Sequence, residues 1–382
     1  MKRVLLLATN ESDAGIGLWC LREAGYTSFA IGNQLKNQGL SYSPLCKHFF
    51  AIPEEYTFSK NSFEILFFLE ALVKSEKLEI ICPSGFDSIK FLGRYYNYLS
   101  RFVKVMPVPK VKTVENLHNK YSFSVFCKEN GIFHPDTRLL ESNEDLAGIP
   151  ESFFPALIKP LSESSSKGVE KFDTFENLKS CLLKRQGSDK NPFPLILQKF
   201  IDGSDIDFNG FASRGKLNSW TIQRTIMVRR ANEPDLKWIQ FVENPEVLRL
   251  GKKIVEKSGY SGPIHIDFRI ESKTKEVKAI EANPRFWATT LCSLCDGVNF
   301  FDVGIKSSFD SAYSLKPRYS YRLWGSPHKV LSLVWGNPNL DFVRLARKHS
   351  FVQVKYLALR SLFAQASNFK KASYAIKGVF KK

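Results

Sequence analysis

Short apolar runs alternate with helix-like patterns over residues 1–112. The apolar runs, each ending in turn residues, are 3–9, 27–32, 78–85 and 102–109. Between them, apolar residues recur at helical spacing in the segments 16–25 and 62–77. Strands that alternate with helices predict a parallel sheet with helices on its faces. We therefore expect an α/β domain over residues 1–112.

After residue 112 the pattern changes to a helix followed mostly by strands. A long helix is predicted to end at Gly131, and Pro135 marks the next boundary. Strand-like runs follow at 153–160, 194–201, 205–213, 217–227 and 265–287. Helical patterns lie between them near 174–185 and at 244–260. This order is typical of an α+β fold.

Two carboxylates stand in the apolar strands of the predicted hairpin at 265–287. With the turn centred on Thr274, Asp267 lies opposite Glu281, and Asn283 follows two residues further along the same face. The residues predicted to point the other way, into a core, are Ile266, Phe268, Ile280 and Ala282. A slip of one residue in the register would separate the two carboxylates.

Carboxylates on a buried sheet face need a cation beside them, because an unpaired buried charge is costly. Three oxygen donors on two strands supply half of an octahedral shell, which Mg²⁺ completes with water and phosphate oxygens. Mg²⁺ also offsets charge in phosphoryl transfer. The hairpin therefore predicts a metal site at Asp267, Glu281 and Asn283. A solvated strand face ending in a turn is the alternative.

Two lysines and a small-residue loop precede the hairpin. Lys159 ends an apolar strand, where a solvated lysine is unusual, and the loop 161–169 with Gly168 follows it. Backbone N–H groups of such a loop approach phosphate oxygens closely, although a flexible linker has the same composition. Lys120, on the preceding helix, is the second basic candidate, and a surface lysine is its alternative.

The strand at 195–205 breaks at Gly203 and offers an apolar slot with backbone groups for an adenine ring. Arg224 on a later strand is a candidate to reach a transferring phosphoryl group. A cross-strand ion pair is the equal alternative for this arginine.

Together these motifs resemble the ATP-grasp enzymes, in particular their carboxylate–amine ligase branch. The resemblance covers residues 113–303 and rests on the order of the motifs NK (119–120), PALIKP (155–160), LQKFIDG (197–203), HIDF (265–268) and EANPRFW (281–287). It implies an ATP-grasp domain at 113–312, with a lid subdomain at about 153–200 and a C-terminal lobe at about 201–312. A looser match implies a Rossmann-like pre-ATP-grasp domain at 1–112. Residues 313–382 are left as a basic, partly helical extension.

The resemblance also implies roles for individual residues. Lys120 and Lys159 look like the pair that contacts ATP phosphates, beneath a lid loop that contains Ser165, Ser166, Lys167 and Gly168. The residues implied to contact the rest of the nucleotide are Gln198, Lys199 and Ile201 at the adenine ring and Asp205 at the ribose. Arg285 is implied to reach the phosphoryl group or the substrate carboxylate.

The sequence departs from the family pattern at three places. Asn119 stands where an Asp is common, Gln198 stands where a Glu is usual, and the lid loop has one glycine where many members have several. Gln198 still offers an acceptor to the adenine amino group. Serine hydroxyls can replace some of the missing glycine N–H contacts.

Ligases of this branch use ATP and Mg²⁺, with Mn²⁺ as an alternative metal, to form an acyl phosphate that an amine then attacks. We expect this activity, with a small-molecule carboxylate and an amine of the amino-acid or amino-sugar type as substrates. A non-catalytic nucleotide or polyanion binder and a phosphotransferase with a non-carboxylate acceptor are the alternatives. His265 is a candidate base or a residue that supports the metal site.

The acceptor is expected between the first domain and the hairpin. Ser84 and Asp87 follow the carboxyl end of a predicted strand, where open sheets place ligands. They are therefore candidate substrate contacts, although a turn with a helix cap uses the same residue types.

Charge adds a further expectation. The chain has a net charge of +17, and the segment 341–382 contains ten Lys or Arg and one acid. Docking on the protein itself, weak contact with an anionic membrane and, least expected, nucleic-acid binding are the alternatives for this tail. Seven scattered cysteines and no long apolar run predict a cytoplasmic protein, free or peripheral at the inner membrane surface. Oligomer formation stays open.

Overall fold

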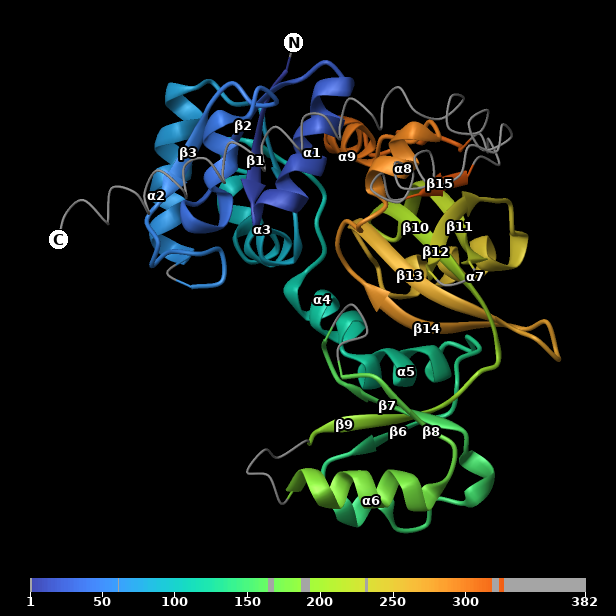
Figure 1. The fold of residues 1–382 in the computed structure, drawn as a ribbon. Helices are drawn as coiled ribbons and strands as arrows, with labels where there is room; N and C mark the ends of the chain where they lie inside the picture. Colours follow the sequence, from blue (N-terminus) through green and yellow to red (C-terminus); the bar gives the residue numbers. More distant parts are fainter. Residues whose placement is uncertain are drawn as a thin grey trace.

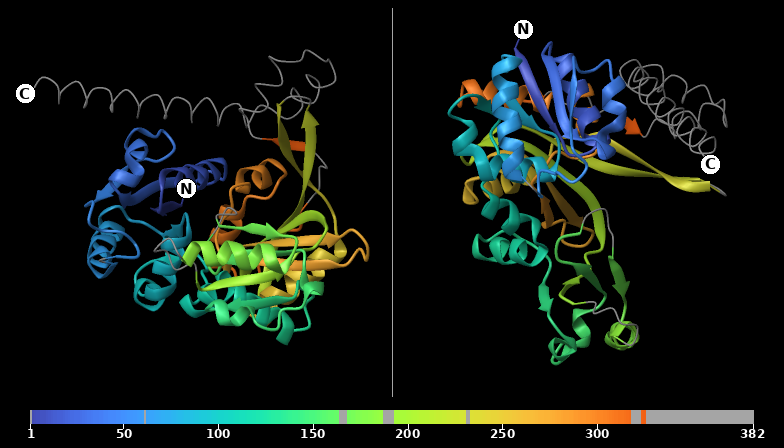
Figure 2. Two further views of the ribbon diagram at one scale, coloured as in Figure 1. Left: turned by 60° about the horizontal axis from the view of Figure 1, so that its bottom comes forward. Right: turned by 90° about the vertical axis from the view of Figure 1, so that its left-hand side faces the viewer.

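Three sheets organise the chain in the computed structural model (Figure 1). The structure describes residues 2–60, 62–163, 168–186, 193–230, 233–317 and 323–325. We refer to residues 2–105 as the N-terminal domain, to residues 137–199 as the small lobe and to residues 203–309 with 323–325 as the large lobe. The small lobe extends from the large lobe away from the N-terminal domain (Figure 1; right-hand view of Figure 2).

The N-terminal domain has the predicted parallel sheet, in the order β3-β2-β1-β4-β5. The strands are β1 (Arg3–Ala8), β2 (Thr27–Asn33), β3 (Phe49–Ile52), β4 (Ile80–Pro83) and β5 (Lys104–Val105). Its helices are α1 (Glu11–Glu23), α2 (Ser62–Ser75), α3 (Phe86–Leu99) and the 3₁₀ segment η1 (Leu35–Tyr42). Both sheet faces are buried, as expected where helices cover a parallel sheet.

The predicted long helix before Gly131 is in fact two helices, α4 (Val111–His118) and α5 (Lys120–Glu129). Asn119 separates them with an extended backbone, and its side chain accepts a hydrogen bond from the Ser122 N–H at 3.0 Å. Asparagine is a favoured N-cap because its oxygen satisfies an unpaired N–H of the first turn. The single-helix prediction was therefore wrong at Asn119, and Lys120 becomes the first residue of α5.

The small lobe is a four-stranded antiparallel sheet in the order β6-β9-β7-β8. Its strands are β6 (Thr137–Leu140), β7 (Ala156–Pro160), β8 (Glu170–Phe172) and β9 (Leu195–Lys199). Helix α6 (Phe175–Gln186) and the short segments η2 (Asn143–Leu146) and η3 (Glu151–Phe153) complete it. Leu178 and Leu182 of α6 pack on Ile158 and Leu197 in a separate small core, so this lobe has its own interior.

The large lobe is built on a six-stranded sheet in the order β14-β13-β10-β11-β12-β15. Its strands are β10 (Gly203–Ser213), β11 (Lys216–Arg230), β12 (Glu233–Phe241), β13 (Gly262–Glu271), β14 (Val277–Asn283) and β15 (Leu323–Gly325). Its helices are α7 (Pro245–Lys257), α8 (Thr290–Cys295) and α9 (Phe300–Phe309). Helix α7 packs closely on the sheet, because a Cβ atom at Gly251 would lie 2.6 Å from the Phe208 ring.

The hairpin of β13 and β14 has the predicted pairing at its functional end. Asp267 pairs with Glu281 and His265 with Asn283. An irregularity then shifts the register, so Phe268 pairs with Ala279. Ile280 is consequently half-buried and lines a cavity, whereas the prediction placed it in the core. That prediction was wrong because a β-bulge places an extra residue on one strand and changes which face it points to.

The N-terminal domain contacts the large lobe through helices far apart in sequence. Helix α9 lies beside α1 (Figure 1), where a Cβ atom at Gly17 would lie 2.9 Å from the Phe301 ring. The predicted basic helical tail, residues 341–382, lies outside the described residues. Within the described part of the chain, no helix is long and apolar enough to cross a membrane.

Candidate active site

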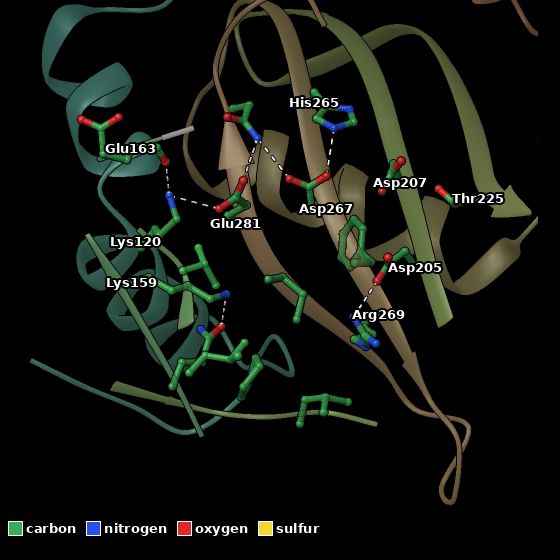
Figure 3. Close-up of a pocket in the computed structure, with 18 of the residues that line it drawn as sticks. Lys120, Lys159, Glu163, Asp205, Asp207, Thr225, His265, Asp267, Arg269 and Glu281 are labelled. Carbon is green, nitrogen blue, oxygen red and sulfur yellow. Dashed lines mark hydrogen bonds and ion pairs between the residues drawn. The ribbon is translucent and has the colours of Figure 1, made fainter. Parts of the chain in front are cut away.

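A cavity of about 470 Å³ lies between the small and large lobes (Figure 3). This volume is in the range of small-molecule sites, ~300–1,000 Å³. The apolar residues that line it include Pro135, Leu157, Val169, Ile201, Phe268 and Ile280. Charged and polar residues of both lobes line the remainder. The cavity therefore has apolar surface for a flat ring and charged surface for phosphates.

The three predicted metal ligands converge at one end of the hairpin. The Asn283 amide nitrogen donates to Asp267 Oδ2 at 3.1 Å and to Glu281 Oε1 at 3.3 Å. All three side chains line the cavity. Two carboxylates and an amide form an oxygen-rich set that suits a hard divalent cation such as Mg²⁺. The donor chemistry therefore fits the predicted metal.

Lys120 connects this acidic group to the opposite wall of the cavity. The residue is only 5% exposed, and its Nζ atom lies 3.1 Å from Glu281 Oε2. The same Nζ donates to the backbone oxygen of Glu163 at 2.6 Å (Figure 3). Its backbone N–H also donates to the Leu161 carbonyl at 2.8 Å. Lys120 is thus a buried cation at the site, and the surface-lysine alternative was wrong.

Lys159 is buried at the end of β7, with 6% of its surface exposed. Its Nζ donates to Gln198 Oε1 at 2.7 Å, and Gln198 Nε2 donates to Thr137 Oγ1 at 3.0 Å. Burial lowers the pKa of Lys159 to about 8, against the opposing effect of the Glu281 charge. In this geometry the Gln198 oxygen predicted for the adenine amino group accepts from Lys159 instead.

The remaining predicted nucleotide contacts lie along the connection between the lobes. The Lys199 N–H donates to the Asp136 carbonyl at 2.8 Å, and Ile201 is buried. Asp205 pairs with Arg269 at 2.8 Å (Figure 3). Lys199, Ile201 and Asp205 all line the cavity, so the structure brings them together with both lysines and the hairpin acids.

His265 supports Asp267 from within the sheet. Its Nε2 lies 2.9 Å from Asp267 Oδ1, its Nδ1 lies 2.7 Å from Asn209 Oδ1, and its ring stacks on Trp287. Burial disfavours the charged imidazole, but the Asp267 and Asp207 carboxylates outweigh it and raise the pKa of His265. Both ring nitrogens are therefore engaged, and His265 orients Asp267.

The sequence analysis missed Asp207, which faces the same cavity from β10. Asp207 pairs across the strands with Asp267, and Gln223 Nε2 donates to its Oδ2 at 3.0 Å. Burial and the Asp267 charge raise the pKa of Asp207. One oxygen or nitrogen atom each from Asp207, His265 and Asp267 lies within 4.8 Å of the others. The sequence does show acidic residues alternating with an apolar one over 205–207. This pattern indicates that Asp207 belongs to the site only once the pairing of β10 with β13 is known.

A buried polar network holds these residues from behind. Asn209 Nδ2 donates to Thr221 Oγ1 and Gln223 Oε1, each at 3.2 Å. Thr289 Oγ1 also donates to Gln223 Oε1, at 2.9 Å. Because these partners are themselves buried and hydrogen-bonded, the orientation of His265 and Asp207 is fixed by the fold.

Two predicted arginines occupy different positions. Arg285 lines the cavity, and its guanidinium donates to the Phe286 carbonyl at 2.9 Å. Arg224 is exposed and donates to Gln240 Oε1 at 2.7 and 3.0 Å on the neighbouring strand. Since Gln223 faces Asp207, the next residue of β11 points to the opposite sheet face. The structure therefore does not bring Arg224 to the site.

The predicted acceptor contacts lie in the N-terminal domain, outside this cavity. Ser84 is 1% exposed, and its hydroxyl accepts from the Thr9 N–H at 2.9 Å, so it holds the loop after β1. Asp87 lies in the first turn of α3. Neither side chain is placed to contact a ligand in the cavity between the lobes. In the lid loop, Gly168 has a left-handed backbone (φ +70°), and Ser165, Ser166 and Lys167 lie outside the described residues.

Comparison with known proteins shows a shared fold. The biotin carboxylase domain of 2-oxoglutarate carboxylase from Hydrogenobacter thermophilus has 18% identity and a TM-score of 0.61, covering 84% of this chain and 71% of that one. L-amino acid ligase from Bacillus licheniformis has 15% identity and a TM-score of 0.60, covering 84% and 75%. N5-carboxyaminoimidazole synthetase from Staphylococcus aureus has 11% identity and a TM-score of 0.61, covering 84% and 80%. No protein-family model and no curated protein sequence matches the chain.

Proposed function

The chain has the ATP-grasp fold, and from it we propose an ATP-dependent ligase that activates a carboxylate as an acyl phosphate and couples it to an amine. One observation carries the proposal. Two buried lysines face two carboxylates and an amide across a cavity of nucleotide size. The structurally similar proteins include a ligase that by name acts on L-amino acids and a carboxylase domain described with MgADP and bicarbonate. These names support the class of reaction.

The proposed nucleotide position follows from the lining of the cavity. The adenine ring would lie against Leu157, Ile201 and Phe268, near the backbone of Lys199. The phosphates would then reach Lys120 and Lys159, whose buried ammonium groups interact more strongly with anions than surface lysines do. Asp205 is the proposed ribose contact, which requires it to exchange Arg269 for the ribose hydroxyls.

Asp267, Glu281 and Asn283 would hold Mg²⁺ by their side-chain oxygens. When bound there, Mg²⁺ neutralises phosphate charge and fixes the orientation of the transferred group. His265 keeps Asp267 oriented through the 2.9 Å contact. Asn283 would rotate its amide so that oxygen, in place of nitrogen, faces the cation.

The proposed reaction has two steps. A carboxylate oxygen attacks the γ-phosphorus of ATP, the bond to the β-phosphate oxygen breaks, and ADP leaves. A neutral amine then attacks the acyl carbon, inorganic phosphate leaves, and the amine loses a proton. Positioning and charge neutralisation drive such a transfer, so no nucleophilic side chain is needed. Arg285, which lines the cavity, is the proposed contact for the carboxylate.

A hydroxylamine assay tests this proposal without knowledge of the amine. The protein is incubated with Mg·ATP, hydroxylamine and pools of carboxylates, amino acids included, and ADP and hydroxamate are measured together. Equal amounts of ADP and hydroxamate that depend on one pool support the ligase. AMP in place of ADP would contradict the acyl phosphate, and ATP binding without either product would favour a non-catalytic nucleotide binder.

Contact of the basic tail with anionic membranes, like a cytoplasmic location, stays a prediction. Sedimentation with anionic vesicles tests the contact. We expect the full chain to sediment and a chain truncated before Asp341 to remain in solution. Equal sedimentation of both would exclude the tail as the membrane contact.

A further inference from the structure

A second cavity of about 860 Å³ lies at the boundary between the N-terminal domain and the large lobe. Its described lining residues come from α3, from β5 and the segment after it, from the turn between β10 and β11, from the loop between α7 and β13, and from the end of α9 and the residues after it. None of them lines the cavity between the two lobes. The proposed ligase reaction leaves this space without a role.

Positive charge dominates the described lining of this second cavity. Arg94 of α3, Lys110 after β5 and Arg214 of the β10–β11 turn contribute three cations from three separate segments. The described lining contains no carboxylate, and no ion pair involving these three residues is found in the described part of the chain. Three like charges around one space repel one another, so an anion between them relieves that repulsion.

Hydroxyl groups add hydrogen-bond donors to the same space. Ser213 is only 8% exposed, and its Oγ is buried with no hydrogen-bond partner among the described residues. Ser261 Oγ accepts from the Arg214 N–H at 2.8 Å, which leaves its own hydrogen to donate elsewhere. An unpaired buried hydroxyl destabilises the free protein, so a ligand that hydrogen-bonds to Ser213 gains from the contact.

The cavity is built on close backbone contacts. A Cβ atom at Gly93 of α3 would lie 2.5 Å from the Pro109 carbonyl oxygen, and one at Gly262 of β13 would lie 3.0 Å from the Pro107 carbonyl oxygen. The segment 107–110 is therefore held between α3 and the start of β13. The backbone of Lys110, at the end of this segment, is therefore held beside α3, which carries Arg94.

We propose that this second cavity binds a small phosphorylated anion. The guanidinium groups of Arg94 and Arg214 match the geometry of phosphate oxygens, and Lys110 adds a point charge. Serine hydroxyls donate to the remaining oxygens. Because its contacts come from the N-terminal domain, the connecting segment and the large lobe, the bound anion holds these three parts together.

Inorganic pyrophosphate is the probe for a titration calorimetry experiment on the full chain. EDTA removes divalent cations, and excess ADP competes for the cavity between the lobes. We expect one binding site for pyrophosphate. The double substitution Arg94→Gln with Arg214→Asn is expected to weaken binding at least tenfold. Both side chains are exposed, and Asn suits the left-handed backbone of residue 214 (φ +51°), so folding is preserved.

A matched control removes two charges elsewhere. Lys60→Gln with Lys128→Gln changes the net charge equally at exposed positions outside both cavities and is expected to leave the affinity within twofold. Equal losses of pyrophosphate affinity in both double variants would show that the effect depends only on net charge, which would overturn the proposal. The proposal would also be overturned if Lys159→Met weakened pyrophosphate binding and the double substitution at Arg94 and Arg214 did not. The anion would then occupy the cavity between the lobes. Absence of binding to the unaltered chain would overturn it as well.

Discussion

The two walls of the cavity between the lobes carry opposite charges and differ in how neighbouring groups compensate those charges. On the small-lobe wall, Lys159 is buried and donates a hydrogen bond of 2.7 Å to the neutral Gln198, with no ion pair among the described residues. On the large-lobe wall, Asn283 donates to both Asp267 and Glu281, and Asp267 also contacts His265. One wall thus holds a cation with little compensation, and the other holds acids in a network.

This difference shows what completes the site. Among the described residues, the one ion pair that joins Asp267 or Glu281 to a lysine is Lys120 with Glu281, at 3.1 Å. The Lys159 ammonium can therefore interact with an anion, and the carboxylate oxygens of Asp267 and Glu281 can bind a cation. Mg·ATP presents both charges at once, because its phosphates face the lysines and its metal faces the acids. Substitutions on one wall at a time therefore separate the two contributions.

The largest effect is expected from the acidic wall. Glu281→Gln removes a metal-binding carboxylate and the Lys120 partner while keeping the shape of the side chain. Hydroxamate formation should fall by roughly 10³-fold or more, since charge neutralisation is the main contribution to phosphoryl transfer. Glu276→Gln, at the turn of the same hairpin, is the control and should retain full rate. Equal rates for both variants would remove Glu281 from the proposed metal site.

A smaller loss is expected from the basic wall. Lys159→Met keeps the length and packing of the side chain and removes its charge. We expect the rate to fall by roughly 10²-fold, as for loss of one donor to a reacting anion. Lys171→Met on β8, whose partner is the exposed Asp173, is the control. A change in rate below twofold for Lys159→Met would contradict a phosphate contact.

Proton uptake on binding of Mg·ATP tests directly whether the charge of Lys159 lacks a compensating partner in the free protein. With a pKa of about 8 in the free protein, Lys159 is mostly neutral at pH 8.5, and ATP phosphates favour its charged form. Binding of Mg·ATP should then take up roughly three-quarters of a proton at pH 8.5, and little at pH 6.5. Calorimetry in buffers of different ionisation enthalpy measures this number.

Two variants sharpen the same measurement. Lys159→Arg should show no uptake at pH 8.5, because arginine remains charged. Gln198→Glu places a carboxylate beside Lys159, raises its pKa and should also abolish uptake. Uptake that persists unchanged in Lys159→Arg would assign the proton to another group.

The smallest effect is expected at Arg224. Its side chain is exposed and bonded to Gln240 on the face of the sheet opposite Asp207. Arg224→Ala should therefore leave hydroxamate formation within twofold, while Arg285→Ala reduces it. A loss in Arg224→Ala comparable to that in Arg285→Ala would show that the sequence prediction for Arg224 was right after all.

Local patterns were sufficient for much of this fold. The alternation over residues 1–112 predicted the parallel sheet, and the turn near Thr274 predicted the pairing of Asp267 with Glu281. Both depend on short-range periodicity, which the sequence displays directly. Motif order supplied the ATP-grasp fold, which the structure confirms.

Features that depend on pairing between distant strands were missed. Asp207 joins the site only because β10 pairs with β13, and Arg224 leaves it because of the register between β10 and β11. The bulge that moves Ile280 to the cavity has no residue signature in the hairpin. The partner of Gln198 likewise depends on the packing of β7 against β9.

The most direct test of the central claim follows one oxygen atom. The carboxylate selected by the hydroxylamine assay is labelled with ¹⁸O and incubated with Mg·ATP and its amine, and the inorganic phosphate is analysed by ³¹P NMR. Attack of the carboxylate on the γ-phosphorus predicts one ¹⁸O atom in each phosphate released, together with ADP. Unlabelled phosphate, or label found in AMP, would contradict an acyl phosphate formed between the two walls of this cavity.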